Sequence, residues 1–174
     1  MSIVRLGIIG LGNMGRFHAD YLLQGKVPRC ELVAVANPSP EKLEMYPTLQ
    51  RFTDAEKLIT SSVVDAVLIA TPHYSHTTLG IQALERGLHV MVEKPVSVHK
   101  ADCERLLAAR KGPGQVLGAM FQLRTEPRYL KLKKLIDDGE LGEIVRVNWI
   151  ITDWFRTEAY YASGGWWAHA IDAG

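Results

Sequence analysis

Residues 3–23 read IVRLGIIGLGNMGRFHADYLL, and this stretch decides the fold. The apolar run Ile3–Ile9 has the length and composition of a strand, a glycine-rich turn follows it, and Met14–Leu23 is amphipathic in the manner of a helix. A buried strand, a tight glycine turn and a helix in this order are the opening unit of a doubly wound α/β domain. The sequence therefore predicts a parallel sheet whose first helix begins at the glycine-rich turn.

The turn Gly10-Leu11-Gly12-Asn13-Met14-Gly15 has the spacing of a dinucleotide fingerprint. Gly10 is expected to form the tight turn, Gly12 to leave bare backbone for a pyrophosphate, and Gly15 to let the helix pack against the strand. The pyrophosphate would meet the free N–H groups at the positive end of the helix. The alternative is that the glycines serve only as a turn. We assign five residues of this Rossmann-type turn to cofactor binding: Gly10, Gly12, Asn13, Met14 and Gly15.

Short runs rich in Val and Ile alternate with amphipathic stretches as far as residue 121. Strands are expected at Ile3–Ile9, Leu32–Ala36, Val63–Ala70, His89–Val92 and Val116–Phe121. Helices are expected at Met14–Leu23, Pro40–Met45, Asp54–Ile59, Thr77–Arg86 and Lys100–Arg110. Several strand candidates are apolar on both faces, which is typical of a parallel sheet covered by helices on both sides. Asp54 and Ser97 are candidate N-caps, and Gly87 is a candidate helix stop.

The pattern changes after Phe121. A helix is expected at Arg128–Asp137, followed by the stop Asp138-Gly139 and a long alternating strand at Glu143–Asp153. We therefore predict a dinucleotide-binding domain at residues 1–121 and the beginning of an α+β substrate or oligomerisation domain at residues 122–174. With about 50 residues, the second segment is too small to bury a core of its own. We interpret the chain as truncated.

Composition narrows the class of protein. The chain has 47% hydrophobic and 22% charged residues, which is ordinary for a globular protein, and a net charge of +1 gives no reason to expect nucleic acid or a membrane as partner. No window approaches the roughly 20 apolar residues of a membrane span. Cys30 and Cys103 lie far apart without metal-ligand spacing, which favours a reduced, cytoplasmic setting. His73 and His76 are three residues apart, but no third ligand completes a metal site.

Asn37 stands at the end of the second expected strand, where a dinucleotide-binding domain usually carries Asp or Glu. An acid there would bond the ribose hydroxyls and repel a 2′-phosphate, whereas asparagine can bond a hydroxyl and repels nothing. Ser39 and Lys42 could serve a phosphate, but no arginine stands beside Asn37. Asn37 alternatively only opens the turn Asn-Pro-Ser-Pro. We favour NAD as the cofactor, with NADP not excluded.

The segment Val90-Met91-Val92-Glu93-Lys94-Pro95 places a lysine at the carboxyl end of an expected strand. Open α/β sheets bind their ligands at that edge. Pro95 restricts Lys94 to an extended conformation, and a lysine in a partly desolvated cleft can exchange a proton with a substrate hydroxyl. Taken alone, a lysine at the end of a strand is more often simply solvated.

Two stretches, GIIGLGNMGRFHADYL and VDAVLIATPHYSHTTLGIQALERGLHVMVEKPVS, together strongly resemble the glucose–fructose oxidoreductase and inositol dehydrogenase family over residues 3–121. The resemblance implies an oxidoreductase that moves hydride between nicotinamide and the CH–OH group of a sugar, inositol or related polyol. It implies that Lys94 contacts substrate and assists proton transfer. Residues Ala70, Thr71 and Pro72 would line the nicotinamide, with His76 nearby and Glu93 beside the ribose.

The sequence departs from that family's pattern towards its end. The family carries an Asp…His catalytic pair after a glycine-rich turn in its second domain, and His169-Ala170-Ile171-Asp172 imitates it only superficially. Arg124, Trp154 and Arg156 are further candidates for substrate contact, with an interdomain or core role as the alternative. We expect a homo-oligomer in a full-length form and no polyol oxidation by these 174 residues alone. A dinucleotide-binding module without turnover is the competing hypothesis.

Overall fold

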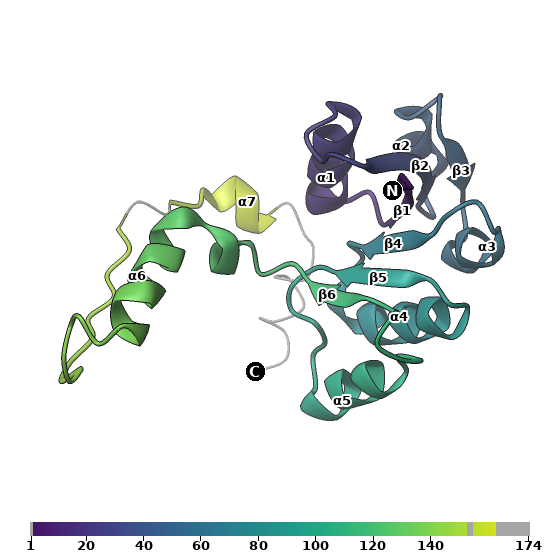
Figure 1. Ribbon diagram of the computed structural model, residues 1–174. Coiled ribbons are helices and arrows are strands. Elements are labelled where there is room, and N and C mark those ends of the chain that lie inside the picture. The colour runs from purple at the N-terminus through teal and green to yellow at the C-terminus, as the bar shows by residue number, and fades with distance from the viewer. Residues whose placement is uncertain (1, 153–154, 163–174) are drawn as a thin grey trace. The chain divides into compact units, whose positions relative to one another are not determined.

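The computed structural model describes residues 2–152 and 155–162, and Figure 1 traces them from the N-terminus onward. Backbone contacts divide the chain into two compact units, Met1–Phe121 and Gln122–Gly174. The first unit contains the sheet and the hydrophobic core.

A six-stranded parallel sheet forms the centre of the first unit, in the order β3-β2-β1-β4-β5-β6. Its strands are β1 (Val4–Ile9), β2 (Cys30–Ala36), β3 (Gln50–Phe52), β4 (Ala66–Ile69), β5 (His89–Val92) and β6 (Leu117–Ala119). The order reverses between β1 and β4, because the chain builds outward through β2 and β3 and then returns to pair β4 against β1. In open sheets of this kind ligands bind at such a switch point, outside the carboxyl ends of the strands.

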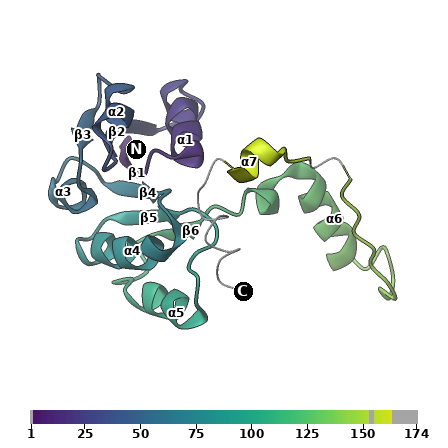
Figure 2. The same cartoon turned by 180° about the vertical axis from the view of Figure 1, so that it is seen from behind.

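Helices cover both faces of the sheet, as Figures 1 and 2 show from opposite sides. The helices of the first unit are α1 (Asn13–Leu23), α2 (Pro40–Glu44), α3 (Ala55–Thr60), the short 3-10 helix η1 (His73–Ser75), α4 (His76–Glu85) and α5 (Lys100–Ala108). Ala19 of α1 and Leu43 of α2 pack on one face, whereas Leu58 of α3, Leu84 of α4 and Leu106 of α5 pack on the other. The expected doubly wound Rossmann-type fold is confirmed.

The alternation of side chains along each strand produces these two cores. In β4, Val67 and Ile69 enter the core under α3, α4 and α5, while Ala66 and Leu68 enter the core under α1 and α2. Residues of a strand point alternately to opposite faces, so a strand that is covered on both sides must be apolar throughout. All four residues of β4 are buried. This is why the sequence shows an unbroken apolar run there.

Most elements of the first unit lie within a few residues of their expected positions, and β5 has the expected bounds, His89–Val92. The short edge strand β3 was not expected, because three residues give too little pattern to detect. Asp54 caps α3 as expected, its carboxylate accepting from the Glu56 N–H at 2.9 Å. The expected cap at Ser97 is wrong. His99 precedes α5 without a capping bond, and the Ser97 hydroxyl instead bonds the Thr77 hydroxyl at 2.7 Å.

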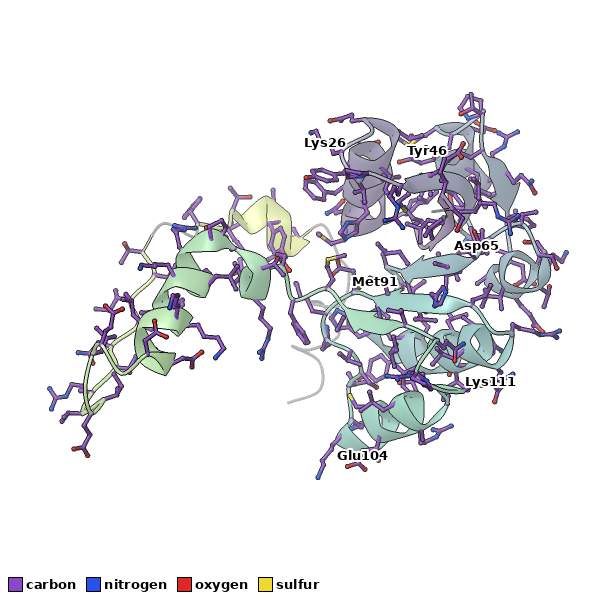
Figure 3. The ribbon with its side chains drawn as sticks, viewed as in Figure 1. Lys26, Tyr46, Asp65, Met91, Glu104 and Lys111 are labelled. Carbon is purple, nitrogen blue, oxygen red and sulfur yellow. The ribbon has the colours of Figure 1, made fainter. Side chains whose placement is uncertain are left out.

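At the amino-terminal edge of the sheet, an ion pair joins the starts of β1 and β4. Asp65, labelled in Figure 3, accepts from the backbone N–H of Arg5 at 2.9 Å and from its guanidinium at 2.7 Å. The hydrogen bonds from Arg5 hold the pKa of Asp65 below its usual value. This edge lies opposite the one expected to bind a cofactor.

The second unit contains η2 (Gln122–Thr125), α6 (Pro127–Asp137) and α7 (Glu158–Ala162) among its described residues. Helix α6 matches the expectation, and α7 was not expected. The strand expected at Glu143–Asp153 is wrong for residues 143–152, which form no strand. A strand needs a neighbour for its backbone hydrogen bonds, and in the described part of this unit no other strand is present to provide them.

None of the helices among the described residues is long and apolar enough to cross a membrane. Cys30 and Cys103 are both free thiols. Burial raises the pKa of the Cys30 thiol, which disfavours its reactive thiolate form.

Candidate functional site

Four loops follow the carboxyl ends of the central strands and carry the residues singled out above. They begin at Gly10 after β1, Asn37 after β2, Ala70 after β4 and Glu93 after β5. Because the strands are parallel, these four loops share one edge of the sheet.

The glycine-rich turn has the geometry that its sequence predicts. Gly10 has a φ of 95°, and a Cβ on it would lie 2.7 Å from the Ala70 carbonyl oxygen. A Cβ on Gly15 would overlap the carbonyl oxygen of Gly10. Gly12 is different, since a Cβ there would meet nothing within 4 Å. Gly10 and Gly15 are therefore required by the fold, whereas the space beside Gly12 is open to a ligand.

Helix α1 presents its amino end at this turn. Gly12 is its N-cap, no side chain caps it, and its first turn contains no acidic residue. The Asn13 side chain turns to Arg16, accepting from the guanidinium at 3.0 Å. The first backbone N–H groups of a helix lack partners inside the helix and carry its positive partial charge. The site therefore combines open space at Gly12 with donors suited to a pyrophosphate.

Asn37 connects this turn to the loop after β2. It is buried, and its amide oxygen accepts from the Leu11 N–H at 2.9 Å, while its amide nitrogen makes a long bond of 3.4 Å to the Ser39 carbonyl oxygen. The Ser39 hydroxyl donates to the carboxylate of Glu41 at 3.0 Å. Asn37 is thus more than the opening of a turn, because it supports the backbone of the glycine-rich loop. Glu41 places a negative charge close by, which the sequence reasoning overlooked.

Helix α4 joins the loops that follow β4 and β5. The fully buried ring of His76 contacts the Thr71 carbonyl oxygen through Nε2 and the Pro95 carbonyl oxygen through Nδ1, each at 2.9 Å. Next to it, the Thr77 hydroxyl bonds Ser97. His76 was expected near the nicotinamide. Its burial and its two backbone partners make it a support for the walls of the site.

The corner Glu93-Lys94-Pro95 follows β5, and the Lys94–Pro95 peptide bond is cis. Lys94 is exposed, and its backbone N–H donates to the Glu93 carboxylate at 3.0 Å. Glu93 is only 4% exposed, and its other carboxylate oxygen lies 2.6 Å from Nε2 of His18 on α1. His18 is a site residue that the sequence reasoning missed. Its position three residues after Gly15, on the sheet-facing side of α1, was the available signal.

The electrostatics at this corner are unusual for buried groups. Burial by itself raises the pKa of Glu93, but hydrogen bonds from His18 and from the Lys94 backbone, with their charges, bring it below its usual value. Burial lowers the pKa of His73, and His76 and Lys94 lower it further. These hydrogen bonds therefore favour the ionised form of Glu93 despite its burial. No group of three or more potential metal ligands occurs among the residues that the structure describes.

The remaining substrate candidates belong to the second unit. Arg124 lies in η2 and is exposed. Arg156 donates to the Tyr160 hydroxyl at 3.0 Å and stacks over its ring at 4.7 Å. Trp154, His169 and Asp172 lie outside the described residues. The substrate contacts expected for Arg124, Trp154 and Arg156 stay predictions.

Three features occur together in the first unit: a parallel sheet with a switch point, an open glycine-rich turn and a helix end without a side-chain cap. Together they define a dinucleotide-binding Rossmann protein. Residues 4–121 match the oxidoreductase family with an NAD-binding Rossmann fold that includes glucose–fructose oxidoreductase and inositol dehydrogenase, and the chain belongs to this family.

Individual relatives agree with the family assignment. The chain is 35% identical to inositol 2-dehydrogenase 4 of Saccharopolyspora erythraea, over 80% of this chain and 42% of that protein. It is 31% identical to the uncharacterised oxidoreductase YdgJ of Escherichia coli, over 97% of this chain and 52% of that protein.

Solved structures show the same likeness. The WlbA dehydrogenase of Bordetella pertussis, solved with NADH and UDP-GlcNAcA, aligns with a TM-score of 0.79 at 27% identity, covering 94% of this chain and 51% of that one. The scyllo-inositol dehydrogenase of Lactobacillus casei, solved with NAD(H) and scyllo-inositol, aligns with a TM-score of 0.73 at 25% identity, covering 82% and 43%. The chain thus spans about half the length of the relatives it matches.

Proposed function

We propose that this chain is the dinucleotide-binding part of an NAD-dependent dehydrogenase that oxidises a CH–OH group of a sugar, inositol or related polyol. The observation that carries the proposal is the open space beside Gly12, at the uncapped end of α1 and on the same sheet edge as Lys94. The named relatives that act on inositols support the substrate class. The division into a dinucleotide-binding domain at 1–121 and a substrate domain from 122 is part of the proposal.

Each residue of the site has a proposed task. The backbone at Gly12, Asn13 and Met14 receives the pyrophosphate, and Ala70, Thr71 and Pro72 line the nicotinamide side. Bound NAD supplies the hydride acceptor. Lys94, with its amine unprotonated, takes the proton of the substrate hydroxyl, because its exposed side chain stands at the sheet edge and a positioned acid–base group can serve that step. Glu93 is proposed beside the ribose.

The loop after β2 and the helix that follows it carry one acidic group that favours NAD over NADP as the cofactor. The Asn37 amide oxygen is used by Leu11, so only its amide nitrogen remains to meet a ribose hydroxyl. The Glu41 carboxylate accepts a hydrogen bond from the Ser39 hydroxyl, two residues after Asn37. Its negative charge would repel a 2′-phosphate. Glu41 therefore supplies the negative charge that Asn37 lacks.

The proposal is tested in two stages. NADH titration of the chain should show saturable binding that a Gly12→Val variant loses. In any form of the protein that turns over a polyol, Lys94→Ala should lower turnover by about two orders of magnitude, the range for a positioned acid–base group, with cofactor affinity nearly unchanged. Turnover within a few-fold of the parent would remove Lys94 from the mechanism.

A second candidate is a dinucleotide-binding module without turnover by these 174 residues. It is favoured by the position of the two core clusters, whose residues all lie before Phe121. The two hypotheses are separated by incubating the chain with NAD and a panel of polyols and measuring the absorbance of NADH. Formation of NADH by the chain itself would exclude the hypothesis of a module without turnover.

A further inference from the structure

His18 and Glu93 form a contact between two elements that lie far apart in the sequence. His18 lies on α1, which follows the glycine-rich turn, and Glu93 lies directly after β5, 75 residues later in the chain. Strand β4 stands between β1 and β5 in the sheet. The contact between Nε2 and Oε1 is 2.6 Å long, and the two side chains are 13% and 6% exposed. It therefore reaches across the switch point at which the proposed cofactor would lie.

The Glu93 carboxylate uses its two oxygens for different parts of the site. Oε1 faces His18, and Oε2 accepts from the backbone N–H of Lys94. The Lys94 backbone is thereby linked through one carboxylate to the helix that starts at the glycine-rich turn. Hydrogen bonds to an ionised group are shorter and stronger than those between neutral groups, so this link can define an orientation.

We propose that His18 is a positioning residue that holds Glu93 and thereby sets the orientation of Lys94 relative to the glycine-rich turn. The proposal rests on the proposed function, in which the dinucleotide binds at that turn and Lys94 meets the substrate. It assigns no contact between His18 and a ligand.

The groups around Glu93 determine how the pKa of its carboxyl would change if His18 were replaced. His18 faces it from α1, Lys94 from its own corner, and His73 and His76 stand near this corner from η1 and α4. Without the His18 hydrogen bond, burial opposes ionisation with less to offset it, so the pKa of Glu93 rises. A residue that only filled space would, when replaced by alanine, let water reach Glu93, and the pKa of Glu93 would then not rise.

The test uses the 174-residue chain with carbon-13 in its lysine and glutamate side chains, followed by NMR. Lys94→Arg and Glu93→Gln identify the two signals of interest. His18→Ala is compared with the parent, with His18→Gln, whose amide can still donate to the carboxylate, and with the matched control His99→Ala. His99 is an exposed histidine that makes no capping bond to α5.

In the parent and in His99→Ala, the Glu93 carboxyl signal should stay in its ionised position over the range of about pH 5 to 8. In His18→Ala, Glu93 should titrate at higher pH, and the change that NADH causes in the Lys94 signal should be lost. NADH affinity should fall by no more than about tenfold, since the hydrogen bond that is removed lies within the protein and does not reach the ligand. His18→Gln should restore part of both signals.

Identical Glu93 titration and identical Lys94 response in folded His18→Ala would overturn the proposal. Should His18→Ala not fold, His18→Gln is compared with His18→Phe, which fills the space without donating a hydrogen bond. A parental pattern of both signals in His18→Phe would overturn the proposal as well. Absence of NADH binding by the parent would overturn the proposed function instead, and the Glu93 titration of the free protein would still decide the role of His18.

Discussion

At the scale of single residues, the glycines of the first turn separate folding from binding. Gly10 and Gly15 have no room for a Cβ, whereas Gly12 has open space and an extended backbone with φ of −72° and ψ of −168°. Any residue can adopt that backbone, so only a ligand requires glycine at position 12. The loop thus contains a position that only binding constrains, Gly12, close to two positions that folding constrains, Gly10 and Gly15.

Gly12→Val should leave the thermal unfolding of the chain unchanged and abolish NADH binding, because its branched side chain occupies the space proposed for the pyrophosphate. Gly15→Ala should instead lower the free energy of unfolding by more than about 2 kcal/mol, since a backbone carbonyl cannot move aside as a side chain can. Calorimetry and fluorescence titration measure the two effects. Normal NADH affinity in folded Gly12→Val would contradict the site.

Asn37 and Glu41 should control the choice of cofactor. Asn37→Asp keeps the acceptor for Leu11 and adds a charge, so the ratio of NADPH to NADH dissociation constants should rise. Glu41→Gln should lower that ratio several-fold, because an exposed charge contributes up to about 1 kcal/mol. Glu44→Gln, on the same short helix, is the control. An unchanged ratio in both Asn37→Asp and Glu41→Gln would place the ribose elsewhere.

At the scale of elements, few side chains connect the loops of the binding edge, and each connects two of them. His76 joins the loops after β4 and β5, Asn37 joins those after β1 and β2, and His18 joins α1 to β5. Because the strands themselves stay paired, a substitution at one of these side chains should displace a loop without loss of the sheet. The amino-terminal edge is joined instead by the Arg5–Asp65 pair.

The Arg5–Asp65 pair should make stability depend on pH in the acid range. The pKa of Asp65 is lowered in the folded protein, so its contribution is present at neutral pH and is lost as the pH falls through that lowered value. Asp65→Asn should therefore lower the urea midpoint at about pH 7, and this effect should disappear as the pH falls through the lowered pKa of Asp65. A difference that persists at the lowest pH would assign the effect to packing.

At the scale of the whole molecule, the two units differ in how much they bury. Every residue of both core clusters lies before Phe121. Between residues 144 and 151 several apolar side chains are exposed, with Val145 at 92% and Ile150 at 82%. Exposed apolar stretches of this kind favour association.

A chain cut after Phe121 should therefore fold and bind NADH within a few-fold of the affinity of the 174-residue chain. The longer chain should also self-associate as its concentration rises, and Val145→Lys together with Val147→Lys should reduce that association. Sedimentation velocity and NADH titration measure both properties. Loss of binding in the shorter chain would show that the second unit contributes to the cofactor site.

The sequence alone determined the opening strand, the glycine-rich turn and its helix, the cap at Asp54 and the parallel character of the sheet. These depend on local chemistry: glycine where no Cβ fits, an acceptor before a helix, and unbroken apolar runs where both faces are covered.

Only the tertiary structure decided three other features: the contact of His18 with Glu93, the use of Ser97 by Thr77 rather than by α5, and the absence of a strand at residues 143–152. Each depends on which distant segment becomes a neighbour. A strand or a buried polar side chain is stable only when its hydrogen-bond partner is in place, and the sequence pattern of one segment contains no information about that partner.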